Sequence, residues 1–418
     1  MYLSASRASD IAGDTRTPAP KGPLRAVPGT VFALGLVSLV TDVSAEMVTA
    51  VLPLYLMAGL GMSPLAFGAL DGLHQGATAL LRLAGGRIAD RTRRRKLVAG
   101  TGYALSAVCK AALLAVTTPW SVAAVLAADR TGKGLRTAPR DALISLSVPP
   151  EQQGRAFGVH RALDTAGALL GPLAAFGVLW VAVDGYAAVF TVSCCLAVLG
   201  VVLLALFVRE APAPVPAAAR APLPPVRTLL RLPGLRRLCL TAAVLGLFTV
   251  GDGFLYLLLQ RRLDLSVAYF PLLPVGTAGV FLLAALPAGR LADRLGRRRI
   301  FLGGHVLLLG ACLLLLAPVP AGALLVVGVL ASLGLFYAAT DGVLMAAAGP
   351  LLPPELRTTG LAAIQTAQAL ARFAGSLLFG AAWTLWGPGW ALGLAAGGLL
   401  LSLALVSVFG GPRAGGPS

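Results

Sequence analysis

The chain consists of about twelve apolar stretches of roughly 18 to 27 residues, each long enough to cross the ~30 Å hydrocarbon core of a bilayer as a helix. Because no water satisfies backbone groups there, only helices or closed barrels can span a bilayer. The stretches lack the period-two alternation of barrel strands. Only 12% of the residues are charged, which is about half of what a soluble domain carries. The sequence therefore predicts an all-α membrane protein with twelve transmembrane helices.

The positions of the charged residues predict the topology. The net charge of +17 does not indicate nucleic-acid binding, because the charges lie in short segments between apolar stretches. The basic segments 91–96, 209–237 and 294–299 alternate with loops that hold no Lys or Arg, apart from Arg261 and Arg262. This bias predicts cytoplasmic basic loops, two cytoplasmic termini and a location in the inner membrane. All five tryptophans lie at the predicted outer ends of spans, where an interfacial aromatic belt forms.

Two short blocks occur twice, at nearly the same distance along the chain. GGRIADRTRRR at 85–95 returns as AGRLADRLGRR at 288–298, and VPPE at 148–151 returns as LPPE at 352–355. We therefore expect two homologous halves of six helices each, related by an axis along the membrane normal, with the substrate site between them. The predicted parts are a disordered cytoplasmic N-terminus (1–28), the N-terminal half (29–208), a cytoplasmic linker (209–235), the C-terminal half (236–410) and a tail (411–418).

The duplicated loop resembles the G-x-[IL]-A-D-R-x-x-R-R-[RK] signature of the major facilitator superfamily, and the resemblance extends over nearly the whole chain. Arg93 departs from it, because the family usually has there the glycine that the second copy keeps as Gly296. The resemblance implies the major facilitator fold and a secondary transporter, with no cofactor and no enzymatic activity. It also implies that both loops help to hold the cytoplasmic side closed. The loop residues concerned are Gly86, Asp90, Arg91, Arg94, Gly289, Asp293, Arg294 and Arg297.

Two further motifs resemble the drug/proton antiporter branch of that superfamily. Segment 126–134 is similar to L-x-x-x-R-x-x-Q-G, with Arg130 as the arginine and Lys133 in place of the glutamine. A second segment is similar to G-x-x-x-G-P, and its motif residues are Gly167, Gly171 and Pro172. The resemblance implies proton-coupled efflux of a small solute. Proton- or cation-coupled uptake is the alternative, and a polytopic membrane enzyme is a remote one, since neither G-x-S-x-G nor H-E-x-x-H occurs.

Ionisable residues inside the spans are candidate functional residues, because they are costly in a bilayer. Asp42 and Glu46 lie deep in the first span, four residues apart and therefore on one face. Neighbouring carboxylates raise each other's proton affinity, which suits a proton carrier; the alternative is a structural pairing. From the helical rise, Asp71 and His74 of the second span lie at the depth of Glu46. A metal-binding role for His74 is a further alternative, but no metal site is predicted.

The fourth and fifth spans supply the bases. Arg130 and Asp164 both lie near the midplane by the same arithmetic, accompanied by Lys133 and Arg161. Arg130 with Asp164, or Asp129 with Lys133, could instead form static pairs that only fix helices. We expect proton coupling in the N-terminal half, a functional monomer, and protons, a small solute and the lipid bilayer as partners. The C-terminal half mainly shapes the cavity, and its candidates are Asp252, Asp341, Gln365, Gln368 and Arg372.

Overall fold

The computed structural model describes residues 29–72, 94–149, 152–182, 185–209, 233–341, 343–348 and 357–409. All regular structure in these residues is helical. Nine of the described helical segments are long and apolar enough to cross a membrane. The prediction of an all-α membrane protein is therefore confirmed. The count of twelve spans and the homology of two halves stay predictions.

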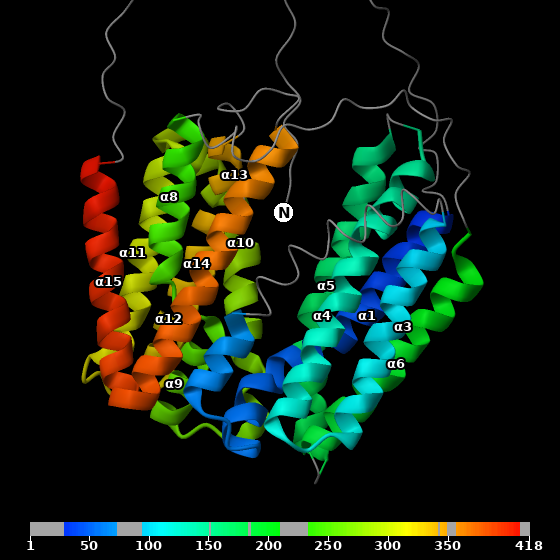
Figure 1. The fold of residues 1–418 in the computed structure, drawn as a ribbon, viewed down its shortest axis with the longest axis horizontal. Helices are drawn as coiled ribbons and strands as arrows, with labels where there is room; N and C mark the ends of the chain where they lie inside the picture. The colour runs from blue at the N-terminus through cyan, green and yellow to red at the C-terminus, as the bar shows by residue number, and fades with distance from the viewer. Residues whose placement is uncertain are drawn as a thin grey trace, which may run out of the picture.

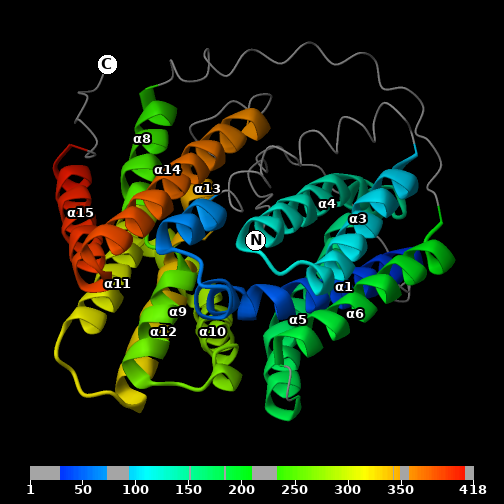
Figure 2. The ribbon, with the colours of Figure 1, turned by 60° about the horizontal axis from the view of Figure 1, so that its bottom comes forward.

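The helices form two groups that converge at one end and diverge at the other (Figure 1). The first group contains α1 (Gly29–Leu54), the π-helical turn η1 (Tyr55–Gly59), α3 (Arg95–Ala115), α4 (Pro119–Leu146), α5 (Gln153–Val181) and α6 (Gly185–Phe207). The second contains α8 (Pro233–Leu247), α9 (Asp252–Leu263), the 3-10 turn η3 (Val267–Tyr269), α10 (Leu272–Leu295), α11 (Arg297–Leu316), α12 (Ala323–Thr340), α13 (Val343–Ala348), α14 (Arg357–Trp386) and α15 (Pro388–Phe409). Helical residues 64–72 leave the first group and pack on α14 (Figure 2).

Small residues let α1 pack closely against α5 and α6. A Cβ added at Gly167 would lie 2.5 Å from a backbone carbonyl oxygen of α1, and one at Gly171 would lie 2.7 Å from the Cβ of Glu46. Such close approach through glycine is typical of membrane helices. On its other side, α1 binds α6, because Ser44 donates to the Ser193 carbonyl at 2.7 Å. The two motif glycines thus hold α5 against the acidic part of α1.

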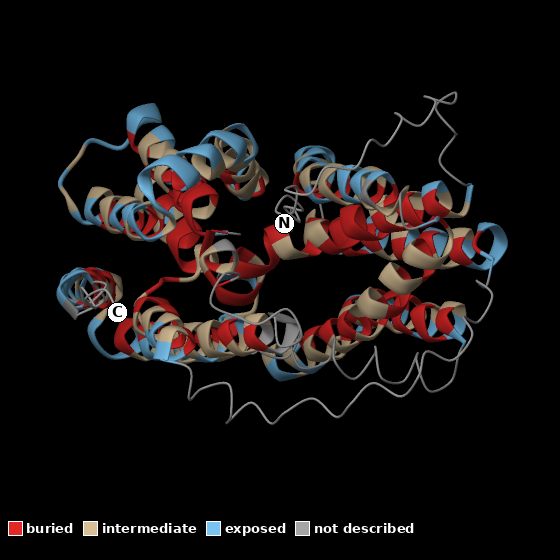
Figure 3. Ribbon diagram, turned by 90° about the horizontal axis from the view of Figure 1, so that it is seen from above, coloured by how far each residue is buried: buried red, intermediate tan, exposed pale blue. Residues whose placement is uncertain are grey.

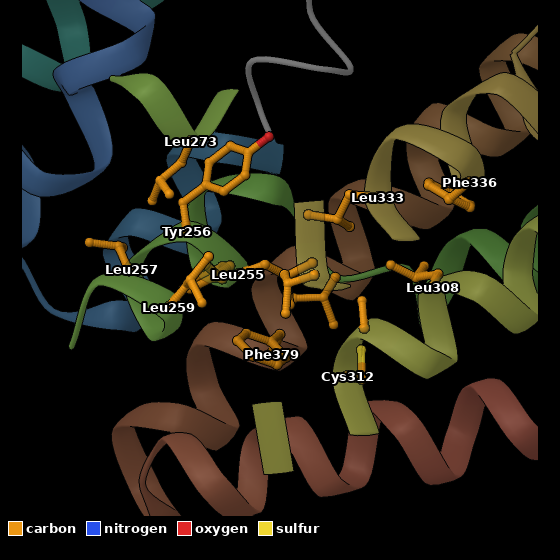
Figure 4. Close-up of a cluster of buried hydrophobic side chains, with 14 of the residues drawn as sticks. Leu255, Tyr256, Leu257, Leu259, Leu273, Leu308, Cys312, Leu333, Phe336 and Phe379 are labelled. Atoms are coloured by element: carbon orange, nitrogen blue, oxygen red, sulfur yellow. The ribbon is translucent and has the colours of Figure 1, made fainter. Parts of the chain in front are cut away.

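Buried apolar side chains fill the second group near the end where the groups converge. Figure 4 shows Leu255 and Tyr256 of α9 in this cluster, together with side chains of α11, α12 and α14. The fully buried ring of Phe254 lies 4.7 Å from that of Phe379 and 4.9 Å from that of Phe67, which belongs to residues 64–72. Exposed residues lie mainly on the outward surfaces of both groups (Figure 3). Aromatic packing therefore connects the two groups at this end.

Trp383 differs from the predicted belt position. It is only 5% exposed and packs against Phe254 and Phe379, whereas the other four tryptophans are each more than half exposed. Its neighbour Arg261 places a guanidinium 5.3 Å from the Trp383 ring centre. Arg262 donates to several carbonyls where α11 ends, including that of Leu315 at 2.7 Å. The two cations that interrupt the charge pattern thus bind an aromatic face and a helix C-terminus.

Candidate functional site

A cavity of about 280 Å³ lies between the two helix groups. Its wall combines α1, α4 and α5 of the first group with residues 64–72, α9 and α10. Four acidic or basic side chains line it, namely Glu46, Asp71, Arg130 and Asp252. Apolar side chains complete the wall, among them Phe67, Leu126, Pro172 and Pro274. The cavity therefore brings together candidates that lie far apart in the sequence.

The two acids of α1 face bases of α4. The Lys133 ammonium lies 3.9 Å from Asp42 Oδ1 and 3.6 Å from Glu46 Oε1. Arg136 lies 3.6 Å from the same oxygen of Asp42. The side chains of Asp42 and Arg136 are almost fully enclosed, whereas those of Glu46 and Lys133 are each 28% exposed. The acids thus share one face of α1, as predicted, and the neighbouring helix supplies their counter-charges.

A second buried ion pair joins α3 to α4. Lys110 Nζ lies 3.1 Å from Asp129 Oδ2, and the two side chains are only 2% and 5% exposed. Arg130 lies 3.7 Å from the same oxygen and donates to Thr49 of α1 at 3.4 Å. The alternative of a static pair between Asp129 and Lys133 is not found in the described residues, where Asp129 pairs with Lys110 and Arg130. Lys110 is not among the residues that the sequence indicated, although a single lysine within an apolar stretch is itself a signal.

Asp164 of α5 has two arginine partners, neither of which is Arg130. Arg140 of α4 lies 3.5 Å from its Oδ1, and Arg161, one turn earlier in α5, lies 3.2 Å from its Oδ2. Arg140 also donates to Ser38 of α1 at 2.9 Å. The alternative of a static pair between Arg130 and Asp164 is likewise not found in the described part of the chain. Because Arg140 contacts both α1 and α5, it holds three helices together nearer to the diverging end.

Asp71 and Asp252 have no base within ion-pairing distance in the described part of the chain. Asp71 accepts a hydrogen bond from Ser376 of α14 at 2.9 Å. Asp252 accepts one from Tyr337 of α12, whose hydroxyl lies 2.7 Å from both carboxylate oxygens. A Cβ added at Gly251 would lie 2.6 Å from Asp71 Oδ2, so this carboxylate touches the start of α9. The two acids therefore meet where the two helix groups join.

The other predicted candidates of the second group lie apart from the cavity wall. Asp341 is exposed at the end of α12, and Gln365 is exposed on α14. Gln368 and Arg372, one and two turns further along α14, are partly buried, and the Arg372 Nε has no hydrogen-bond partner in the described residues. His74 lies outside the described residues. No group of three or more His, Cys, Asp or Glu residues that could hold a metal ion occurs in the described ranges.

The second of the duplicated loops separates α10 from α11. Gly296 has a φ of +96°, which residues with a side chain rarely adopt. Asp293 is exposed and lies 3.5 Å from Arg297, while Gly289 and Arg294 belong to the last turns of α10. In the first copy, Arg94 is exposed just before α3. The other residues of that copy, Gly86, Asp90, Arg91 and Arg93, lie outside the described residues.

One basic residue at the end of each loop signature binds the C-terminal end of another helix in the same group. Lys96, at the start of α3, donates to the Ala205 carbonyl of α6 at 2.9 Å. Arg298, at the start of α11, donates to the Val406 carbonyl of α15 at 2.6 Å. Cations favour helix C-termini, where carbonyl groups lack partners. These two cations therefore stabilise helix ends as well as contributing to the charge bias of the loops.

Two groups of membrane helices around a charged cavity form the arrangement expected of a secondary transporter. The family model of the Major Facilitator Superfamily matches residues 34–282 and 253–417. The chain therefore belongs to this superfamily. It is a multi-pass membrane transporter for small molecules rather than an enzyme.

Relatives and solved structures agree with this assignment. An uncharacterized MFS-type transporter of Methanocaldococcus jannaschii is 28% identical over 364 residues, which are 85% of this chain and 88% of the relative. The multidrug resistance protein MdtH of Cronobacter sakazakii is 34% identical over 114 residues, 27% of this chain and 28% of that protein. A variant of the nucleoside transporter NupG has a TM-score of 0.79 at 14% identity, covering 91% of this chain and 100% of the other. At that identity, the likeness to NupG concerns the fold alone.

Proposed function

We propose that this chain exports a small solute in exchange for protons, by alternating access to the central cavity. The observation that carries the proposal is the position of Glu46, which lines the cavity and shares Lys133 with Asp42. Lys133 donates no hydrogen bond to either acid in the described residues, so protonation of Glu46 breaks only its charge contact with Lys133. Lys133 and Arg136 stay close to the two acids, and their positive charges favour release of the bound proton.

Export is favoured over uptake by two likenesses. The segments with Arg130 and Gly171 resemble motifs of drug/proton antiporters, and part of the chain is similar to a protein named for multidrug resistance. Proton- or cation-coupled uptake is the second candidate, because the same acids could bind an ion that moves together with the substrate. The two candidates differ in the direction of proton movement relative to the solute.

The proposal includes twelve spans in two halves, 29–208 and 236–410. Besides the nine apolar spans, α4 and α14 have 28 and 30 residues and are long enough to cross a bilayer. The charges of α4 keep it from standing out as apolar. The helix that contains residues 64–72 would be the twelfth. Residues 1–28, 209–235 and 411–418 would then be cytoplasmic, the membrane the inner membrane, and the working unit a monomer.

The duplicated loops are proposed to hold the cytoplasmic side closed in the other conformation. In the structure the groups diverge at one end (Figure 1), and Asp293, in the last turn of α10, is exposed. An exposed acid beside exposed arginines can bind a partner when this end closes. Asp90 occupies the corresponding position of the first copy. The structure would therefore correspond to a cytoplasm-open state.

Proton movement in inside-out vesicles tests the coupling. A growth screen of a strain that overproduces the protein supplies candidate compounds, and a pH-sensitive dye follows the acid interior that respiration creates. A compound added outside should release protons from the vesicles if the protein is an antiporter. The variant Asp42→Gln/Glu46→Gln, at equal abundance, should not respond. Proton release only from vesicles preloaded with the compound would contradict antiport and support symport.

A further inference from the structure

A second hollow, of about 640 Å³, lies at the end where the helix groups converge. It shares no lining residue with the central cavity. The ends of α3 and α5, the start of α6 and the turn η1 form most of its wall, and η3 of the second group closes it. We call it the side pocket, and its main lining residues are Tyr55, Leu113, Leu179, Tyr186, Phe190 and Val267.

An irregular turn builds the aromatic wall of the side pocket. The helix α1 ends in the π-helical turn Tyr55–Gly59, a deviation that is frequent at functional sites. The Tyr55 ring lies 5.1 Å from that of Tyr186 and 5.0 Å from that of Phe190, with Phe190 edge-on. A Cβ added at Gly59 would approach Tyr55 to 3.2 Å, so glycine leaves room for this arrangement. The wall is therefore fixed by packing before any ligand enters.

The chemistry of the side pocket indicates its occupant. None of the described residues that line it carries a charge, so a phosphate, carboxylate or ammonium group would find no counter-charge among them. The hydroxyls of Tyr55 and Tyr186 form no hydrogen bond within the described residues and can bind a polar ester. Two of the lining residues, Leu179 and Ala182, flank Trp180 and Val181 in the sequence, and these two apolar side chains at the end of α5 are 61% and 83% exposed. Hydrocarbon with a polar end, as in a membrane lipid, fits these features.

One wall of the side pocket depends on contact between the helix groups. Val267 belongs to η3, and the neighbouring Tyr269 lies 5.6 Å from Trp180 and 5.9 Å from Phe176, both in α5. If alternating access separates the groups at this end, η3 moves away and the pocket loses that wall. A ligand that binds only the closed form shifts the population toward it.

We propose that an acyl chain of a lipid from the outer leaflet occupies the side pocket and stabilises the conformation that is closed at this end. The part that concerns conformation depends on the proposed alternating access. The part that concerns binding depends only on the pocket. The lipid would then regulate transport from a site separate from the substrate cavity.

Lipid retention tests the binding. The full chain is washed with mild detergent and its mass is measured intact by native mass spectrometry. The wild type should retain one phospholipid that Ala187→Trp loses, because Ala187 lines the pocket and the larger ring fills it. The control is Leu324→Trp, at a position that is 81% exposed at the start of α12, and it should retain the lipid. Equal retention in both variants, or a bound mass that is not a lipid, overturns the assignment.

Accessibility of the central cavity tests the conformational effect. Ala127→Cys places a thiol in the cavity wall, and an impermeant maleimide labels it from the outer side of right-side-out vesicles, with the parent chain as blank. In these vesicles phospholipid is always present, so the lipid should slow the labelling of Ala127→Cys several-fold relative to Ala127→Cys/Ala187→Trp, which excludes it from the side pocket. Equal labelling with and without Ala187→Trp overturns the proposed stabilisation. Neither measurement involves protons or substrate, so failure of the export proposal leaves both outcomes readable.

Discussion

Replacing Lys110 by methionine should destabilise the protein strongly, although this residue does not line the transport cavity. At an effective dielectric constant of about 20, two charges at the 3.1 Å separation of Lys110 and Asp129 attract by about 5 kcal/mol. Removing one partner of a buried pair typically destabilises a protein by ~3–5 kcal/mol, because the other charge stays buried. Arg130, at 3.7 Å, compensates for part of the loss. We therefore expect about 3 kcal/mol, roughly a hundredfold in the unfolding equilibrium.

The double variant Lys110→Met/Asp129→Asn separates the charge effect from lost packing. It removes both charges of the pair, while Arg130 loses its contact with Asp129 but keeps its hydrogen bond to Thr49 and its place in the wall of the cavity. Replacement of a buried ion pair by neutral groups is often close to neutral in free energy. The double variant should therefore unfold within about 1 kcal/mol of the wild type and be clearly more stable than the single variant. Equilibrium unfolding in mixed micelles of SDS and a mild detergent, followed by far-ultraviolet circular dichroism, measures all three proteins.

Two outcomes would refute this reasoning. A single variant within about 1 kcal/mol of the wild type would mean that Asp129 does not need Lys110. A double variant no more stable than the single one would mean that Lys110 acts through packing rather than charge. The variant Lys110→Arg is a further control, because it keeps the charge but must place a larger, planar group in the same space.

Three further predictions concern transport and assembly. Asp42→Asn should abolish pumping against a gradient but retain exchange between preloaded vesicles, because exchange needs no net proton movement; normal accumulation by this variant would make the acid structural. Asp293→Asn should abolish most transport at near-normal abundance, measured by compound efflux and immunoblot, and full transport would refute the gating role. Gly171→Leu should lower stability by at least ~1–3 kcal/mol, because its side chain would overlap Glu46 on α1, whereas Gly177→Leu, with open space around its Cβ, should unfold like the wild type.

The sequence alone predicts an all-α membrane protein, because a long apolar stretch without strand periodicity can satisfy its backbone polar groups in a bilayer only as a helix. It did not reveal the break between α8 and α9, which a hydropathy window joins into one span, Pro233–Leu263. The helix stops at Leu247 and restarts at Asp252, which accepts the Tyr337 hydrogen bond. Glycines at 251 and 253 flank this acid in the sequence. An acid between two glycines inside an apolar stretch is the signal that could have indicated the break.

The partners of the intramembrane charges could be predicted only in part. Depth along a helix follows from residue number, so the common level of Asp42, Glu46 and Lys133 could be anticipated. The choice of partner depends on helix rotation and tilt, which packing determines. At the crossing of α3 and α4, a Cβ added at either Gly102 or Gly132 would lie 2.7 Å from the carbonyl oxygen of the other. This close contact between the two glycines helps to orient α3 so that Lys110 reaches α4. The residue pattern of one helix alone does not predict such a contact between two helices.

The two sets of acids differ in how helix motion can affect them. The ion pairs of Asp42 and Glu46 lie within the first group, between α1 and α4, so a rigid movement of the groups leaves those distances unchanged. Asp71 instead contacts Ser376 and Gly251 of the second group, and these contacts exist only while the groups meet. A ligand or proton shifts a conformational equilibrium only if it interacts differently with the two states. In the proposed mechanism, a proton on Glu46 would therefore act on the movement through the hydration of the cavity, which Glu46 and Asp71 both line. In this scheme the cavity links Glu46 to the contact between the two helix groups at Asp71. A solute that displaces water from the cavity would then couple protonation of Glu46 to the movement of the groups.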